Sequence, residues 1–240
     1  IDTAPEAEMD YRKVPLHVRI RGFLRGRQEN IENLLREMVN TNSYVRNVEG
    51  VNQLLNIMKK HLNQMGFSLQ TYPQVEVGNI HFYTNNDNEE YDILLLGNTD
   101  NNVKLAQHEY FDLSEQKIFG TGVWENKGGL SVMLAALQAL RFIRMIKKIR
   151  IGILLTSDDS LQGRFAKRLV REKSRNAKYI LGLHGAFLDG GIVTSRSGAA
   201  TYNTQINLVK SGDAGMVSRA AVTFSKFITS CCDLSDPENG

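Results

Sequence analysis

The sequence of 240 residues lacks any uninterrupted apolar segment long enough to cross a lipid bilayer. Its longest candidate, residues 130–146, is interrupted by Gln138 and two arginines, so we expect no membrane span. Cysteine is also scarce, because Cys231 and Cys232 are the only two, and adjacent cysteines seldom form a structural disulfide. No signal peptide is visible, and we expect a soluble protein that is either cytoplasmic or exported after cleavage of such a signal.

The sequence also has little net charge. Lysine and arginine number 29 against 26 acidic residues, and a formal charge of +3 is too small by itself to indicate nucleic-acid binding. The basic residues are nevertheless clustered, at 12–27, 141–150 and 164–175. We interpret these clusters as solvated helix faces, with a surface for a polyanion or an acidic partner as the alternative. The remaining composition is that of one full globular domain and part of a second.

Residues 1–27 are interpreted as an N-terminal arm. Its opening segment is polar, and Val14, Leu16, Val18 and Ile20 then alternate with other residues, which predicts a short strand or an extended arm.

The next part of the chain changes from helical to strand-like patterns. Apolar residues with helical spacing predict helices at 28–39 and 51–65, and Gly66 is a candidate C-cap for the second. Three short strand-like runs follow, at 67–72, 79–84 and 91–96.

Strands and helices alternate through the middle of the chain. A long apolar helix opens at residues 127–129, and a basic amphipathic helix is predicted at 160–174. The apolar runs at 149–156 and 179–183 predict strands that are buried on both faces. This alternation predicts an α/β fold, a mixed sheet flanked by helices, in a domain that covers residues 28–198.

The pattern changes after Gly198. Residues 202–208 alternate between apolar and polar, which predicts a half-exposed strand, and residues 214–232 have the pattern of a helix. We therefore interpret residues 199–240 as part of a second, α+β domain.

Four polar motifs lie at the ends of predicted strands, where open α/β sheets bind their ligands. They are Leu-Gly-Asn-Thr-Asp at 96–100, Gly-Thr-Gly-Val-Trp-Glu-Asn-Lys-Gly-Gly at 120–129, Thr-Ser-Asp-Asp-Ser at 156–160, and Tyr-Ile-Leu-Gly-Leu-His-Gly at 179–185. Each motif alone says little, because an aspartate after a strand is commonly a helix cap or a turn former.

Together and in this order, the motifs resemble those of the di-zinc family of aminoacylases, glutamate carboxypeptidases and succinyl-diaminopimelate desuccinylases. The resemblance runs from about Glu29 to Gly215, and its most specific part is the run at 120–129 followed by an apolar helix. It implies a zinc-exopeptidase-like fold for residues 28–198 and a partial dimerisation-type or lid-type domain for residues 199–240. In this family two zinc ions activate a water molecule and a glutamate acts as the general base.

The resemblance assigns four metal positions, and this chain fills them unusually. Asn98 stands where the family has a zinc-binding histidine, while Asp100 keeps the aspartate that orients that histidine. Glu125 stands at the position of the bridging aspartate, Ser160 at that of a glutamate ligand, and His184 at that of a further glutamate. A neutral amide is a poor zinc ligand, and a serine would have to lose its proton to replace a carboxylate.

The two catalytic positions are altered as well. Asp159 stands where the family has its general-base glutamate, and Asp213 stands where it has a histidine that stabilises the oxyanion. The last zinc-binding histidine of the family has no counterpart in this sequence. We therefore expect no physiological cofactor, with a single or adventitious zinc ion as the alternative.

These departures favour a catalytically inactive homologue with a binding or regulatory role and a pocket for a peptide or an N-acyl amino acid. One alternative is an active metallohydrolase that cleaves such molecules with an atypical site of Asp100, Glu125, Asp159 and His184. A further alternative is a structural subunit, a homo- or heterodimer in which the strand at 202–208 pairs with an intact relative. No nucleic-acid partner is expected.

Overall fold

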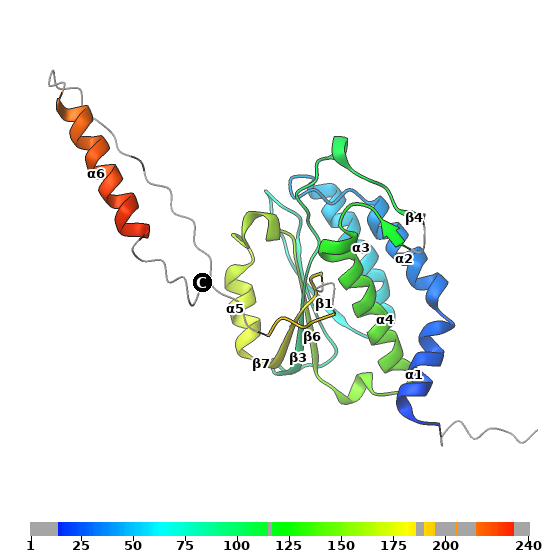
Figure 1. Cartoon of the computed structure of the whole chain (residues 1–240). Coiled ribbons are helices and arrows are strands. Elements are labelled where there is room, and N and C mark those ends of the chain that lie inside the picture. Colours follow the sequence, from blue (N-terminus) through cyan, green and yellow to red (C-terminus); the bar gives the residue numbers. More distant parts are fainter. Residues whose placement is uncertain (1–13, 115–116, 186–189, 195–204, 206–214, 233–240) are drawn as a thin grey trace, which may run out of the picture. The chain divides into compact units, whose positions relative to one another are not determined.

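The computed structural model describes two separate units of the chain (Figure 1). They cover Ile1–Gly185 and Ala186–Gly240, and the residues described are 14–114, 117–185, 190–194, 205 and 215–232. In the second unit the described structure includes one helix, α6, at Gly215–Cys232, where a helix was predicted. Among the described residues, no helix is long and apolar enough to cross a membrane.

The first unit is built around a mixed sheet of five strands in the order β1-β2-β6-β3-β7. The strands are β1 (Ser68–Tyr72), β2 (Ile80–Thr84), β3 (Tyr91–Asn98), β6 (Ile151–Thr156) and β7 (Ala177–Gly182). β6, β3 and β7 run parallel to one another, whereas β2 is antiparallel to both β1 and β6. A small hairpin of β4 (Asp112–Ser114) and β5 (Lys117–Phe119) stands apart. The predicted α/β fold with a mixed sheet is confirmed.

Helices cover both faces of this sheet (Figure 1). On one side lie α2 (Gln28–Asn40), α3 (Val48–Gln64) and α4 (Gly128–Phe142), and on the other lies α5 (Lys167–Arg175). The helices predicted at 28–39 and 51–65 are both present. Asn47 caps α3 by accepting a hydrogen bond from the backbone N–H of Gly50, and Gly66 follows the helix with a left-handed φ of 89°.

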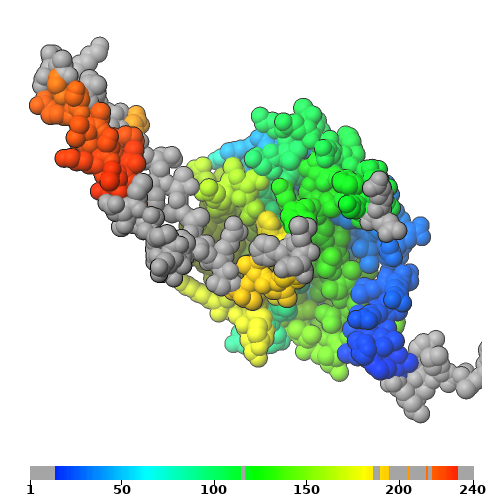
Figure 2. All heavy atoms as spheres, in the orientation of Figure 1, coloured from blue at the N-terminus to red at the C-terminus, as the bar shows by residue number. Residues whose placement is uncertain are grey.

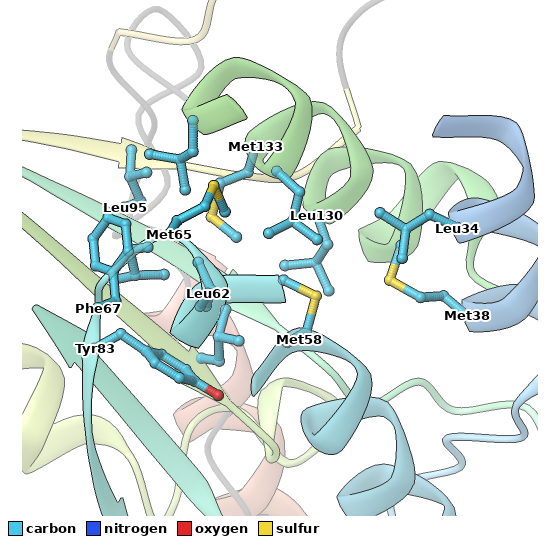
Figure 3. Close-up of a cluster of buried hydrophobic side chains, with 14 of the residues drawn as sticks. Leu34, Met38, Met58, Leu62, Met65, Phe67, Tyr83, Leu95, Leu130 and Met133 are labelled. Atoms are coloured by element: carbon cyan, nitrogen blue, oxygen red, sulfur yellow. The ribbon is translucent and has the colours of Figure 1, made fainter. Parts of the chain in front are cut away.

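The larger hydrophobic core lies between α2, α3, α4 and the sheet. In Figure 3, Met58 and Leu62 of α3 meet Leu130 and Met133 of α4, with Leu95 of β3 beside them. Four of these five side chains are at most 3% exposed, so the helical spacing in the sequence marks the faces that are removed from water. This packing holds α4 against the sheet, and the run at 120–129 continues into the first residues of that helix.

The N-terminal strand prediction is wrong, because residues 16–25 form a helix, α1. Pro15 stands immediately before the helix, where its fixed φ and missing N–H are tolerated. The ring of Phe23 stacks on Phe142 of α4 at 4.5 Å between centroids. Contact with α4 thus stabilises a helix in a segment whose apolar residues also fit an alternating pattern.

Two further predictions need correction. The strand at 179–183 was expected to be buried on both faces, yet β7 lies at the sheet edge and its residues Lys178–Gly182 are exposed. An apolar run has the same appearance in a central strand and in an edge strand, which explains the error. The helix expected from residue 160 begins only at Lys167, because the short 3-10 turn Asp159–Leu161 and a further turn precede it.

Candidate functional site

Three of the sequence-predicted positions lie at the carboxyl ends of neighbouring parallel strands. Asn98 is the last residue of β3, Asp159 follows β6 and His184 follows β7. β3 pairs with both of the other strands in parallel, so the ends of all three lie at one edge of the sheet. Open α/β sheets bind ligands at this edge, which makes it the candidate site.

Asp100 ties the end of β3 to the turn that follows β6. Its carboxylate accepts a hydrogen bond from the backbone N–H of Asp159 at 3.0 Å and another from that of Ser160 at 2.9 Å. Asp100 is only 1% exposed, and this burial raises the pKa of its carboxyl, against the opposing effect of the hydrogen bonds with Ser160 and Asp159. The aspartate therefore sets the positions of residues 159 and 160.

Asn98 and Asn126 both donate to the backbone carbonyl of Asp100. The donor–acceptor distances are 3.2 Å from Asn98 Nδ2 and 2.8 Å from Asn126 Nδ2. Asn98 is 6% exposed, and its Oδ1 is buried without a hydrogen-bond partner in the described part of the chain. The side chain that the resemblance assigns to a zinc-ligand position is thus held by the backbone beside it.

The run at 120–129 forms a turn that only glycine permits. Gly120 and Gly122 have φ values of 135° and 81°, and a π-helical turn at Val123–Lys127 then leads into α4. The fully buried Lys127 donates from Nζ to the backbone carbonyl of Thr41 at 2.9 Å. Burial lowers the pKa of Lys127 to about 8, although the nearby Glu125 carboxylate acts in the opposite direction.

The loop after β7 packs on this turn. A Cβ added to Gly185 would lie 2.7 Å from the indole Nε1 of Trp124, and one added to Gly129 would lie 2.7 Å from the carbonyl oxygen of Leu183. These close approaches place His184 and its neighbours against the beginning of α4. Trp124 nevertheless keeps 60% of its surface exposed.

His184 and Asp159 meet at this edge of the sheet. Nε2 of His184 lies 3.5 Å from Oδ2 of Asp159, and both side chains are more than half exposed. Glu125 is also exposed and lies in the turn beside Trp124. Asp213 and the expected strand at 202–208, apart from Gln205, lie outside the described residues.

Sequence reasoning missed one buried carboxylate next to the site. Asp158 is fully buried, and its Oδ2 accepts hydrogen bonds from the backbone N–H groups of Phe165 at 2.6 Å and Ala166 at 3.0 Å. It thereby fixes the chain between the 3-10 turn and α5. No local signal marks this contact, because its partners lie seven and eight residues further along the chain, beyond the reach of a helix-cap motif.

The residues that the resemblance assigns to metal positions do not fit a dinuclear zinc centre. Zinc needs several imidazole, thiolate or carboxylate ligands that converge on one point. In the part of the chain that the structure describes, no group of three histidine, cysteine, aspartate or glutamate side chains is placed to hold a metal ion. Asn98 offers only a neutral amide oxygen, which is a poor zinc ligand, and Ser160 has a neutral hydroxyl in place of a carboxylate.

Comparison with known proteins identifies the fold. No protein-family model matches the sequence, and a search of curated proteins finds no match. Human carnosine dipeptidase 1 has a similar structure, with a TM-score of 0.63 and 13% identity over 72% of this chain and 42% of that protein. The dipeptidase Dug1p from Saccharomyces cerevisiae has a TM-score of 0.58 and 10% identity, covering 69% of this chain and 40% of Dug1p.

An M20 family metallo-carboxypeptidase from Sulfolobus solfataricus is also similar, with a TM-score of 0.54 and 14% identity over 65% of this chain and 38% of that enzyme. The protein therefore has the α/β fold of the zinc exopeptidases. It spans less than half the length of each of these three structures. At such low identity the similarity concerns the fold alone.

Proposed function

We propose that this protein is a catalytically inactive relative of the zinc exopeptidases, which binds a peptide or an N-acyl amino acid and has a binding or regulatory role. The observation that carries the proposal is the hydrogen bonding of the Asn98 side chain. Its amide donates to the carbonyl of Asp100 instead of offering an imidazole to a metal ion. A protein with the fold but without the converging ligands loses metal-activated water, which supplies most of the acceleration in this chemistry.

The scaffold around the lost ligands supports a retained binding role. Asp100 still holds the turn after β6, and Lys127 still anchors the turn before α4 to the end of α2. The strand ends therefore keep a defined geometry. The exposed side chains there, Asp159, His184 and Trp124, offer charge, hydrogen bonds and an aromatic surface to a small ligand.

A second candidate function is an active metallohydrolase with an atypical site. The proximity of His184 and Asp159, at 3.5 Å, favours it, because an imidazole and a carboxylate are both zinc ligands. Asp100 and Glu125 would complete the set that the sequence suggests. Against it, Asp100 uses both carboxylate oxygens to hold backbone N–H groups. The third candidate, a structural subunit pairing through residues 202–208, rests on the sequence pattern alone.

Metal analysis and a substrate panel together test the proposal. After dialysis without a chelator, elemental analysis is expected to find less than one zinc ion per chain. Amino-acid release from N-acyl amino acids and dipeptides is expected to be absent with added zinc, cobalt or manganese. Two tightly held zinc ions, or turnover that disappears in Glu125→Ala but survives in the matched surface variant Glu109→Ala, would establish the metallohydrolase instead.

Binding is tested separately from catalysis. We expect at least one N-acyl amino acid or dipeptide of the panel to bind in isothermal titration calorimetry. The double variant Asp159→Asn/His184→Gln should weaken this binding at least tenfold, whereas Asp112→Asn on the separate hairpin should not. Binding that is equally strong in all variants would place the ligand elsewhere and remove the proposed role of the strand ends.

A further inference from the structure

A strongly basic surface of the first unit lies on α5 and the turn before it. Five basic side chains line one hollow on this helix and the turn before it, together with Glu172 and Asn176. They are Arg164, Lys167, Arg168, Arg171 and Arg175, and all five are exposed. Within α5, Lys167 and Arg168 precede Arg171 by four and three residues, and Arg175 follows Arg171 by four, so these side chains lie along one side of the helix over roughly 12 Å, at a rise of about 1.5 Å per residue.

Few neighbouring carboxylates neutralise these five cations. Among the residues that the structure describes, none of the five forms a salt bridge. Glu172 is the one acidic residue in the hollow, and its carboxylate already lies 3.3 Å from Nζ of Lys173. Five like charges on one short helix and the turn before it raise the local positive potential, and they favour an anionic ligand.

The helix presents this row from a fixed position. Its opposite side is buried, with Ala166 1% and Leu169 9% exposed in the second hydrophobic cluster. Lys173 also turns inward, since its Nζ lies 4.8 Å from the ring centre of Phe82. Because the apolar face is already used by the protein core, α5 has no apolar face to insert into a bilayer. In Figure 2 the α5 segment, in yellow-green, forms part of the outer surface.

The composition of the hollow indicates the chemistry of its ligand. Its lining contains no aliphatic or aromatic residue, so it offers no apolar anchor of the kind that dominates protein–protein interfaces. Four of the five cations are arginines, whose planar guanidinium groups bind phosphate through paired hydrogen bonds. The other basic clusters of the sequence lie at α1 and around the end of α4, on the opposite side of the sheet (Figure 1).

We propose that the α5 hollow binds a compact, multiply phosphorylated small molecule. A hollow formed by one helix suits a ligand with several adjacent phosphates. A nucleic-acid duplex, by contrast, needs basic groups spread over a wider surface. This site is separate from the strand ends and does not depend on the proposed function.

The test uses inorganic tripolyphosphate as the probe and isothermal titration calorimetry as the measurement. Saturable binding of one tripolyphosphate per chain is expected in low salt, and it should weaken as salt is added. The double variant Arg168→Gln/Arg171→Gln should weaken binding at least tenfold. The control Lys147→Gln/Lys148→Gln removes the same charge from exposed residues in the 3-10 turn Ile146–Lys148, which follows α4, and should change binding less than twofold. Thermal melting and circular dichroism check that both variants remain folded.

Several results would overturn the proposal. One is the absence of saturable binding, and another is an equal loss in both double variants, which would indicate a response to net charge. Citrate that binds as tightly as tripolyphosphate would show that phosphate is not selected. Tighter binding of a 20-base-pair DNA duplex, or of vesicles with anionic lipid, through Arg168 and Arg171 would assign the surface to nucleic acid or membrane instead.

Discussion

Asp100 and Ser160 are joined by a hydrogen bond of 2.9 Å between the carboxylate of the first and the backbone N–H of the second. The two residues belong to neighbouring strand ends, and the same carboxylate also holds Asp159. In the family that the sequence resembles, this aspartate orients a zinc-binding histidine. Here its carboxylate supports the backbone, so it has a structural task that does not depend on a metal ion.

The first prediction concerns Asp100→Asn. The variant keeps the size of the side chain, but it replaces one acceptor oxygen by an NH₂ group that faces a backbone N–H. One buried donor then lacks a partner, and we expect the free energy of unfolding to fall by about 2–3 kcal/mol. Urea denaturation measures this loss. The exposed Asp112→Asn serves as the control, and an equal effect of both substitutions would contradict the proposed role of Asp100.

The second prediction concerns the contact between Gly185 and Trp124. In Gly185→Ala the new methyl group would lie 2.7 Å from the indole and 2.8 Å from the backbone carbonyl of Trp124, so the loop after β7 must move. We expect a loss of roughly 1–3 kcal/mol in stability. Since Trp124 is the single tryptophan, its fluorescence emission should shift as well. Gly182→Ala, which meets no atom within 4 Å, should leave the emission unchanged.

The third prediction is a pH dependence caused by Lys127. Burial lowers its pKa from 10.5 to about 8 in the folded protein. Between these two values the unfolded chain binds more protons than the folded chain, so stability rises as pH increases from 8 to 10.5. The contribution is at most about 3 kcal/mol. Denaturation midpoints across this range should show the rise, and Lys127→Met should lose it while the exposed Lys104→Met keeps it.

Much of the fold could be predicted because its signals are local. The helices at α2 and α3 have regular apolar spacing, and β2, β3 and β6 have compact apolar runs between turns. The ends of strands are likewise visible as polar residues after an apolar run, so Asn98, Asp159 and His184 could be named from the sequence alone.

What could not be predicted depends on contacts between distant segments. Packing of Phe23 on Phe142 stabilises a helix where alternation suggested a strand. The edge position of β7 follows from its pairing with β3 alone in the described structure, and an apolar run carries no information about that. The hydrogen bonds from the backbone of Phe165 and Ala166 to the buried Asp158 depend on the path of the chain between them, which no motif specifies.

The last prediction concerns restoration of a metal site. Asn98→His replaces an amide that donates to the Asp100 carbonyl with an imidazole, but it adds only one ligand, and zinc sites in proteins need three or four. We therefore expect Asn98→His to retain no more zinc after dialysis than the parent protein or the control Asn98→Gln.

The combined variant Asn98→His, Asp159→Glu, Ser160→Glu and His184→Glu supplies carboxylates at the family positions and should retain about one zinc ion per chain. Hydrolysis should remain absent, because the sequence resemblance assigns Asp213 to the position of the oxyanion-stabilising histidine and catalytic groups act as a unit rather than additively. Elemental analysis and amino-acid release measure the two outcomes separately. Zinc retained by Asn98→His alone would show that the remaining side chains already form a metal site, and it would favour the metallohydrolase over the inactive relative.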